Sequence, residues 1–360
     1  MDEEEDQEDP EPQPVSSQRC RKRRRRGQAE QMSTSPPVHV VAATIGVCAV
    51  SADIVDDAVV DGLALEPGAR IVPDREVRNT AGPERERWRL AAEKEVQESF
   101  LRLGAVSETT PDELARVGGR SGVLPMKAVW TIKGDGMWKC RGVACGNFAD
   151  RQPTEQVWTA QAETSSVLAG LRLAMVRKWS VGTMDVKHAF MTEDIPKDML
   201  IVVRPLQIWV DLGLVKPGTL WICLRAIYGL RQSPRIWGLG RDRKLRRARW
   251  QVGPKTFKLQ QCTSDSQVWM IKEEGGSGDT YGLVIVYVDD LLLLSPAGDV
   301  RAALKEHLKS IWEMSEVPDL TPGISLSFIG LELEMESSGH RPSACIHKAA
   351  SGQLRARPDE

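Results

Sequence analysis

Long apolar runs are missing from this chain of 360 residues. A helix that spans a bilayer needs roughly 20 consecutive apolar residues, and no stretch approaches that length. The chain begins Met1-Asp2-Glu3-Glu4-Glu5, whereas a signal peptide needs a basic start and an apolar core. We therefore expect neither a transmembrane segment nor a secretory signal, and we expect a cytoplasmic or nuclear location.

Cysteine is sparse, and its pattern argues against two kinds of stabilising site. The seven cysteines are an odd number at irregular spacing, which is not typical of a disulfide framework. Cys140 and Cys145 have no second Cys or His pair nearby, so a zinc site is not expected either. This usage fits a reducing compartment.

A net charge of −2 hides a segregation of charge near the N-terminus. Residues 2–11 are mostly acidic, whereas Arg19–Arg26 is almost entirely basic. Neither block can fold alone, so we expect residues 1–82 to form a disordered charged leader. The basic block is compatible with a nuclear-import or nucleic-acid-binding patch, and equally with a solvated charge run.

Apolar residues become periodic from about residue 83 onward. Steps of three or four residues predict three amphipathic helices, at Glu84–Leu103, near Val167–Met175 and at Asp299–Trp312. Ala128–Lys133 and Met137–Ala144 flank a Gly-Asp-Gly segment, which predicts a β-hairpin.

The segment Tyr287-Val288-Asp289-Asp290 carries the most information about function. It separates two short apolar runs, and this pattern predicts a hairpin with a two-residue Asp-Asp turn, because Asp tolerates the positive φ of such turns. Two adjacent carboxylates at a strand tip could bind a metal ion or could form an ordinary solvated turn. Asp185, at the end of another apolar stretch, supplies a third carboxylate and favours the metal site.

Five motifs, in the same order along the chain, resemble the reverse transcriptases of Ty1/copia retrotransposons. Tyr287–Asp290 matches the YVDD box of that family, and Thr183–Phe190 resembles the segment that carries the other catalytic Asp. Three further segments of the chain are similar to segments of that family: Ala226–Trp237, Lys139–Gly146 and Phe328–Glu332. The ordered set is far more specific than YVDD alone.

This resemblance implies an α+β fold, namely a right-hand polymerase palm and fingers with a truncated thumb. The implied domains are the leader, a reverse transcriptase domain at 83–340 and a tail at 341–360. Within the middle domain the resemblance implies fingers at about 83–180, a palm at about 181–298, and a partial thumb with the primer-grip region at about 299–340.

The implied activity is RNA-directed DNA synthesis with two Mg²⁺ or Mn²⁺ ions, which hold the primer 3′-oxygen and the incoming phosphate in line. By the resemblance, the catalytic and metal-binding residues are Asp185, Asp289 and Asp290. Nucleotide-binding candidates are Lys139, Arg141, Phe190, Tyr228 and Gly229. Candidates for nucleic-acid binding are Arg231, Arg235, Arg243, Lys244, Arg246, Phe328 and Gly330. The expected partners are dNTPs and an RNA or DNA template with its primer.

Without the resemblance, several of these residues have ordinary interpretations. Lys139 and Arg141 would be solubilising charges on a strand face, and Phe190 would be a core ring. The basic stretch Arg231–Arg249 suits contact with a phosphate backbone but equally a solvent-facing helix.

Motifs of the neighbouring domains of such elements are missing. Ser337–Glu360 holds no acidic cluster of a ribonuclease H, and no integrase zinc motif or protease signature precedes the polymerase motifs. We therefore expect an isolated polymerase segment, with ribonuclease H or integrase as possible separate partners. The alternatives are a catalytically inactive nucleic-acid-binding relic and, less in keeping with the motifs, an unrelated Mg²⁺ phosphotransferase.

Overall fold

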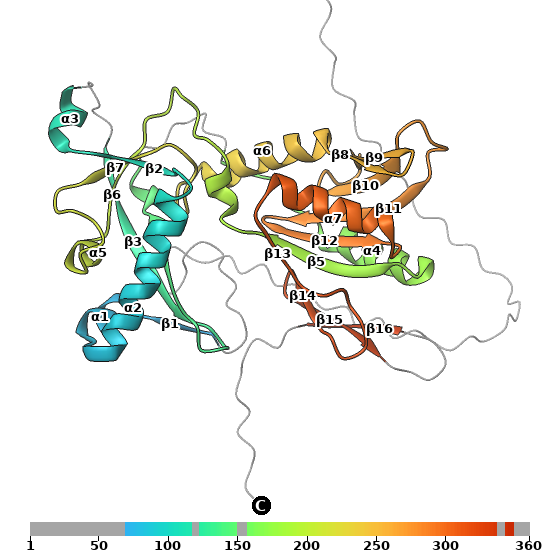
Figure 1. Cartoon of the computed structure of the whole chain (residues 1–360), viewed down its shortest axis with the longest axis horizontal. Helices are drawn as coiled ribbons and strands as arrows, with labels where there is room; N and C mark the ends of the chain where they lie inside the picture. Colours follow the sequence, from blue (N-terminus) through green and yellow to red (C-terminus); the bar gives the residue numbers. More distant parts are fainter. Residues whose placement is uncertain (1–68, 117–121, 150–156, 337–342, 349–360) are drawn as a thin grey trace, which may run out of the picture. The chain divides into compact units, whose positions relative to one another are not determined.

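The computed structural model describes residues 69–116, 122–149, 157–336 and 343–348 (Figure 1). Most of the predicted leader and most of the predicted tail lie outside the described residues. A strand and a helix already occur between Arg70 and Asn79, so folded structure begins before the boundary predicted at residue 83. Within the described residues, none of the helices is both long and apolar enough to cross a bilayer.

The first part of the fold is a six-stranded sheet. Its strands are β1 (Arg70–Val72), β2 (Val106–Thr109), β3 (Val123–Ile132), β4 (Trp138–Ala144), β6 (Val202–Arg204) and β7 (Leu220–Cys223). The helical segments near it are α1 (Asp74–Asn79), α2 (Gly82–Lys94), the π-helix η1 (Glu95–Leu101), α3 (Pro111–Arg116), the 3₁₀ turn η2 (Gly146–Phe148) and α5 (Gln207–Asp211). The strand order is β1-β3-β6-β7-β2, with β4 paired to β3.

Two predictions concern this sheet. The hairpin is confirmed, because β3 and β4 are antiparallel partners. Their register runs from Met126 opposite Ala144 to Ile132 opposite Trp138. The helix predicted at Glu84–Leu103 is confirmed as α2 followed by η1. By contrast, β6 and β7 were expected within the palm segment, yet they pair with β3 and β2 in this sheet.

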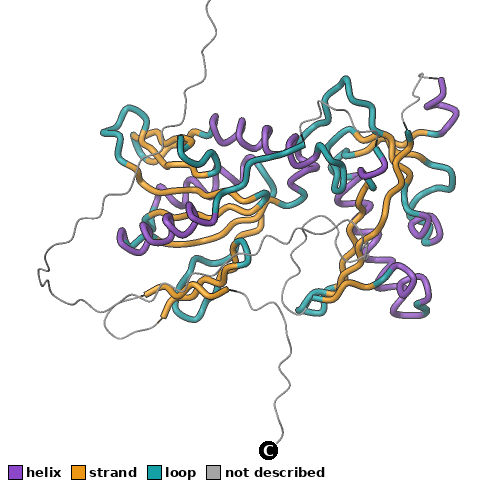
Figure 2. Tube along the Cα trace, turned by 180° about the vertical axis from the view of Figure 1, so that it is seen from behind, coloured by secondary structure: helices purple, strands orange, loops and turns teal. Residues whose placement is uncertain are grey.

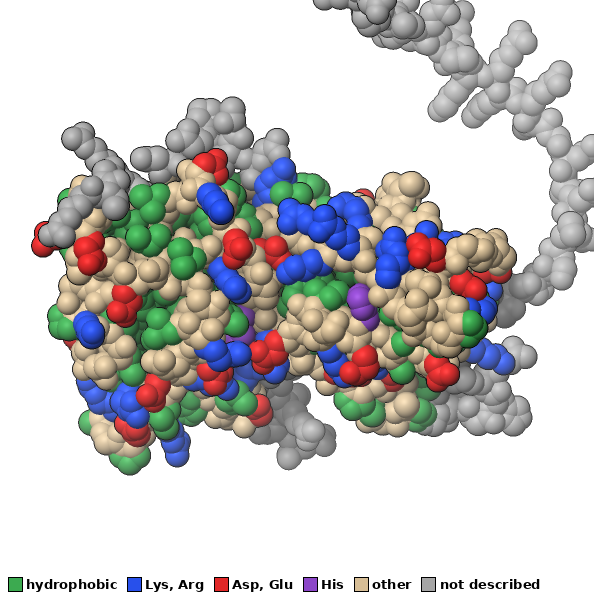
Figure 3. All heavy atoms as spheres, turned by 45° about the horizontal axis from the view of Figure 1, so that its top comes forward, with side chains coloured by type: hydrophobic (Ala, Val, Ile, Leu, Met, Phe, Trp, Pro, Cys, Tyr) green, Lys and Arg blue, Asp and Glu red, His purple; other side chains and the backbone are tan. Residues whose placement is uncertain are grey.

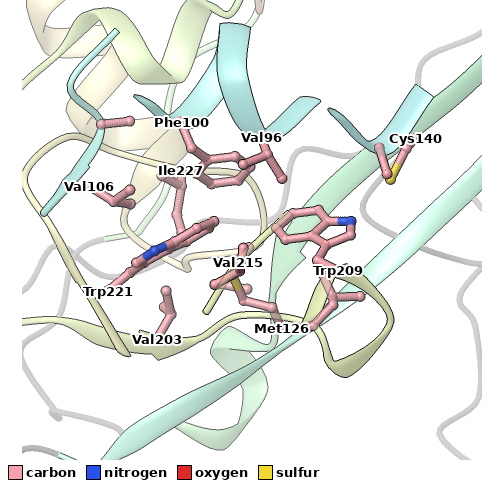
Figure 4. Packing of buried hydrophobic residues seen from close by; sticks show 14 of the residues in the cluster. Val96, Phe100, Val106, Met126, Cys140, Val203, Trp209, Val215, Trp221 and Ile227 are labelled. Atoms are coloured by element: carbon pink, nitrogen blue, oxygen red, sulfur yellow. The ribbon is translucent and has the colours of Figure 1, made fainter. Parts of the chain in front are cut away.

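A core rich in aromatic rings fills this part of the fold (Figure 4). The rings of Phe100, Trp209 and Trp221 lie with centroids 5.2 to 5.8 Å apart, and all three side chains are fully buried. Each large buried side chain stabilises the fold by about 1.5–3 kcal/mol. The periodic apolar residues of α2 and η1 supply one wall of this core, which explains why the local pattern predicted the helix.

A seven-stranded antiparallel sheet follows. Its strands are β5 (Ser180–Val186), β8 (Arg249–Val252), β9 (Lys255–Gln261), β10 (Val268–Glu273), β11 (Thr280–Tyr287), β12 (Asp290–Ser295) and β13 (Met314–Glu316). The helical segments beside it are α4 (Thr164–Arg177), the 3₁₀ turn η3 (Ala189–Thr192), α6 (Ser233–Arg247) and α7 (Asp299–Ile311). The strand order is β13-β5-β12-β11-β10-β9-β8.

Both faces of this sheet are covered by helices (Figure 2). Successive side chains of a strand point to opposite faces. Val284 and Val286 therefore pack with residues of α6 and α7, whereas Ile285 packs with residues of α4. Burial on both faces accounts for the uninterrupted apolar runs of β11 and β12. The helices predicted around 167–175 and at 299–312 are confirmed as α4 and α7.

A small three-stranded sheet completes the described residues. It consists of β14 (Leu326–Phe328), β15 (Leu331–Glu336) and β16 (Ser343–Lys348), in that order. Ile329 and Gly330 form the turn between the first two strands, with φ angles of 50° and 73°. Phe328 is 2% exposed and packs in the same core cluster as α4.

Candidate active site

The strands that carry the three acids are hydrogen-bonded neighbours. β5 and β12 are antiparallel, and their register places Asp185 opposite Asp290. The amide of Val186 donates to the carbonyl oxygen of Asp289 at 3.0 Å. Side chains at opposed positions of antiparallel strands start from Cβ atoms about 4.5–5.5 Å apart. Acids that are distant in the sequence are thus brought to one end of the sheet.

The turn before the acids differs from its prediction. Asp290 already pairs with Tyr287 in the β11–β12 ladder, so the connecting residues are Val288 and Asp289 and the predicted Asp-Asp turn is wrong by one residue. The positive φ, 53°, falls on Val288. A β-branched residue in this region is rare and costs about 1–3 kcal/mol. The strained residue therefore directly precedes Asp289.

Two side chains of α6 hold the strained turn. Trp237 Nε1 donates to the carbonyl oxygen of Val288 at 2.8 Å, and Arg241 Nη1 donates to the same oxygen at 2.9 Å. Sequence reasoning grouped Arg241 with the basic stretch Arg231–Arg249, but its side chain is 1% exposed. The four-residue spacing of Trp237 and Arg241, which puts them on one helix face, was the signal that could have suggested a shared partner.

Burial and mutual repulsion change the acidity of the carboxyls. The pKa of Asp290 is raised from 3.8 to about 7, mainly by burial and further by the charges of Asp289 and Asp185. Burial and the charge of Asp185 also raise the pKa of Asp289, whereas the positive charges of Arg141 and Lys139 oppose that rise. Carboxylates crowded in this way favour a nearby cation.

The donor chemistry of these residues fits Mg²⁺ or Mn²⁺. Mg²⁺ prefers carboxylate oxygens and is commonly bound by one or two carboxylates together with waters and substrate phosphates. Among the described residues, no group of three or more His, Cys, Asp or Glu side chains is arranged to hold a metal ion by itself. Ser315 Oγ donates to Asp185 Oδ2 at 3.0 Å and orients that carboxylate.

Three of the nucleotide-binding candidates form a stack. The guanidinium carbon of Arg141 lies 4.5 Å from the ring centroid of Tyr228, and that ring meets Phe190 edge-on with centroids 5.2 Å apart. The pKa of Tyr228 is raised from 10.0 to about 12, mainly by burial; the charge of Arg141 opposes the rise, and the charges of Asp289 and Asp185 contribute to it. The stack therefore lies within electrostatic reach of the acids. Lys139 is exposed two residues before Arg141, on the same strand face.

Gly229 brings the loop after β7 against β4. Its φ is 86°, and a Cβ atom there would overlap the carbonyl oxygen of Ala144. The amide of Ala144 donates to the Tyr228 oxygen at 2.8 Å, and the amide of Gly146 donates to the Gly229 oxygen at 3.1 Å. Gly229, one of the nucleotide-binding candidates, thus makes a close backbone approach to the neighbouring strand, and this contact seats Tyr228 beside Arg141.

The nucleic-acid candidates on α6 differ in exposure. Arg243 and Arg246 are exposed, and Lys and Arg side chains gather along this helix in the space-filling view (Figure 3). Arg246 also donates to Gln261 Oε1 at 2.9 Å. Lys244 is half-buried, pairs with Glu193 Oε1 at 2.5 Å and lies over the Trp312 ring. The exposed arginines are therefore the residues of this helix that a phosphate backbone could reach.

The remaining candidates occupy other positions. Arg231 and Arg235 are both half-buried. Arg231 lies just before the start of α6, and Arg235 lies in its first turn. Phe328 is a core ring, so its side chain is not at the surface, whereas Gly330 is exposed in the β14–β15 turn. A cavity of about 410 Å³ near α3 and α5 is lined by residues that include Leu114, Arg204 and Val210, and none of the candidates lines it.

The model of the family described as "Reverse transcriptase (RNA-dependent DNA polymerase)" matches residues 119–348, which is more than half of the chain. The chain belongs to this reverse transcriptase family. The resemblance to the polymerases of Ty1/copia-type elements, inferred from the motifs, is thereby confirmed.

Curated relatives of this chain are transposon proteins. A protein of transposon Ty5-1 from Saccharomyces cerevisiae is 23% identical over 159 residues, which are 43% of this chain and 44% of that protein. The retrovirus-related Pol polyprotein from transposon RE1 of Arabidopsis thaliana is 25% identical over 183 residues, 51% of this chain and 11% of that protein. The chain thus spans less than half the length of either relative.

Among solved structures, the foamy viral protease-reverse transcriptase in complex with double-stranded DNA is similar, with 14% identity and a TM-score of 0.36. The similarity covers 69% of this chain and 34% of that chain.

Asp290→Asn tests the repulsion among the acids. Because the pKa of Asp290 is raised, its ionisation destabilises the folded chain as the pH increases from about 4 to about 7. The neutral variant avoids this cost. We expect its free energy of unfolding at pH 8 to exceed that of wild type by about 1–3 kcal/mol, taking roughly 1.4 kcal/mol per pKa unit and a reduction for partial exposure. Near pH 4 the difference should disappear.

Urea unfolding at both pH values, with a chelator present, measures this difference. Asp279→Asn is the matched control, because Asp279 is exposed at the opposite end of β11. An advantage of Asp290→Asn that is the same at pH 4 and pH 8 would show that charge repulsion is not its cause.

Proposed function

We propose that this chain is an RNA-directed DNA polymerase of a Ty1/copia-type retroelement, which adds nucleotides to a primer 3′-hydroxyl. The observation that carries the proposal is the register of β5 and β12, which sets Asp185 opposite Asp290 and beside Asp289. Membership of the reverse transcriptase family supports it.

In this proposal the parts of the fold have the roles of a right-hand polymerase. The seven-stranded sheet with α4, α6 and α7 is the palm, and the six-stranded sheet belongs to the fingers. The fingers then include β6, α5 and β7, which follow Asp185 in the sequence. The β14–β15 hairpin is the primer-grip region of a partial thumb.

Asp185, Asp289 and Asp290 form the proposed metal-binding acids, with Asp290 as the third member beside the two principal ligands. Two divalent ions held there would neutralise the charge that develops during in-line transfer of the nucleotide. Asp185 is oriented by Ser315, and Asp289 by the turn that α6 holds. The polymerase needs no covalent catalysis from its side chains, because positioning and electrostatics supply the rate.

The residues of the stack would bind the incoming nucleotide. The cationic groups of Lys139 and Arg141 act on the pKa of Asp289, so they lie where a triphosphate that approaches this acid would meet them. Phe190 packs edge-on against Tyr228 and would present its ring to the sugar. A ring in that place excludes a ribose 2′-hydroxyl and selects deoxynucleotides.

The exposed cations of α6 would bind the template–primer. Arg243 and Arg246 offer charge to phosphates without base contacts, so this binding should be independent of sequence and weaken with salt.

Asp289→Asn should abolish extension of a DNA primer on an RNA template with Mg²⁺ or Mn²⁺, because the amide keeps the shape of the side chain but cannot bind the cations as a charged ligand. Primer extension by purified wild type and variant measures this. Asp279→Asn, at the other end of β11, is the control and should extend normally. Equal extension by wild type and Asp289→Asn rejects the role of this acid, and salt-dependent binding with no incorporation by wild type would favour the inactive relic.

Phe190→Ala should relax the choice of sugar. Removal of the ring leaves space for the 2′-hydroxyl, so we expect the ratio of ribonucleotide to deoxynucleotide incorporation to increase by roughly 10–100-fold, the range that a steric pocket supplies. Single-nucleotide incorporation of dNTP and rNTP measures the ratio. Phe190→Leu retains most of the bulk and should stay close to wild type. An unchanged ratio in Phe190→Ala would contradict the steric role.

A further inference from the structure

The carbonyl group of Val288 is the point at which α6 contacts the acidic turn. Trp237 Nε1 lies 2.8 Å and Arg241 Nη1 2.9 Å from this single oxygen. The two donors are four residues apart, so they lie on the same face of the helix. Two donors on one acceptor fix the orientation of the peptide group that joins Val288 to Asp289.

The orientation of this peptide group decides where the Asp289 side chain begins. A peptide unit is planar, so the oxygen of Val288 and the nitrogen and Cα of Asp289 move together. Val288 has a φ of 53°, a conformation that a β-branched residue keeps only where its surroundings enforce it. Loss of a donor would let the turn relax and would displace the Asp289 carboxylate.

The guanidinium of Arg241 is buried and hydrogen-bonded to other residues of the protein. Its Nε and Nη2 donate to Asp242 Oδ1 at 3.0 and 2.8 Å, and Nη2 also donates to Gln267 Oε1. The backbone oxygen of Gln267 in turn accepts from the amide of Val286 at 2.9 Å. Every guanidinium nitrogen therefore has a protein partner, and the network ends on the strand that carries the turn.

We propose that Trp237 and Arg241 are positioning residues for the polymerase reaction, which act through the Val288 carbonyl and hold the Asp289 carboxylate where it binds a divalent ion. This inference rests on the proposed function. It assigns the one buried arginine of α6, Arg241, to the geometry of the acids, whereas contact with nucleic acid falls to exposed arginines such as Arg243 and Arg246.

Trp237→Phe is the variant that tests this role most cleanly. It removes the Nε1 donor and keeps an aromatic ring at a position that is 0% exposed and packs edge-on against Trp312. Trp269→Phe is the matched control. Its ring is also 0% exposed in the same core cluster, but within the described part of the chain its Nε1 has no hydrogen-bond partner. Both variants lose the same atoms, and only the first loses a contact to the turn.

Two readouts separate positioning from folding. The first is Mn²⁺ affinity, from the electron paramagnetic resonance signal of the free ion. The second is primer extension, as kcat, the KM for primer–template and the Mg²⁺ concentration at half-maximal rate. For Trp237→Phe we expect losses of about 10–100-fold in Mn²⁺ affinity and in kcat, the range typical of groups that orient a metal ligand. The KM for primer–template should not change, and Trp269→Phe should match wild type.

Arg241→Lys is the second test variant, because it keeps the positive charge but has one donor nitrogen in place of three. We expect it to lose less Mn²⁺ affinity than Trp237→Phe, and it decides the question if Trp237→Phe does not fold. Equal Mn²⁺ affinity and kcat in the test variants and in Trp269→Phe overturn the proposal, as does a wild type that binds no Mn²⁺. A wild type that binds Mn²⁺ but extends no primer rejects the proposed function, and the Mn²⁺ affinities alone then decide the positioning role.

Discussion

The hydrogen-bonded ladder between β5 and β12 is the constraint on which the candidate site depends. Its register sets Asp185 opposite Asp290, and the bond from Val186 to the Asp289 carbonyl extends the pairing to the turn. A slip of one residue would turn every side chain of a strand to the other face. Because both faces of this sheet are buried, such a slip would exchange the residues that pack against α4 with those that pack against α6 and α7, and both sets of contacts would be lost. The packing of the sheet thus fixes the place of the acids.

Several features at this end of the sheet destabilise the folded state. The charges of Asp289 and Asp185 raise the pKa of Asp290, Val288 has an unfavourable φ, and a guanidinium is buried behind the turn. Each feature is unfavourable alone, and together they are offset by the apolar cores around them and by the paired groups of Arg241. Such a concentration of local cost is typical of sites that bind charged ligands. A divalent cation with a triphosphate would relieve the repulsion among the acids.

The sequence predicted the elements whose signals are local. The apolar runs on either side of Tyr287–Asp290 predicted the strand pair, and the periodicity of Asp299–Trp312 predicted α7. It did not predict the turn residue, because a positive φ is rare for a β-branched residue and the donors to the Val288 carbonyl come from α6, about 50 residues away in the sequence. The burial of Arg241 depends on Asp242 and Gln267, and the pairing of β6 with β3 joins distant segments. Both are tertiary effects that leave little trace in a local pattern.

The proposed function requires that the carboxylates of β5 and of the β11–β12 turn share divalent ions. Diffraction from crystals of the chain with primer–template, a dNTP and Mn²⁺, recorded at the manganese absorption edge, locates such ions directly. We predict anomalous peaks at coordination distance, roughly 2.0–2.2 Å, from oxygens of both Asp185 and Asp289. Peaks that contact only one of these residues, or an Asp185 side chain directed away from Asp289 in the loaded complex, would contradict it.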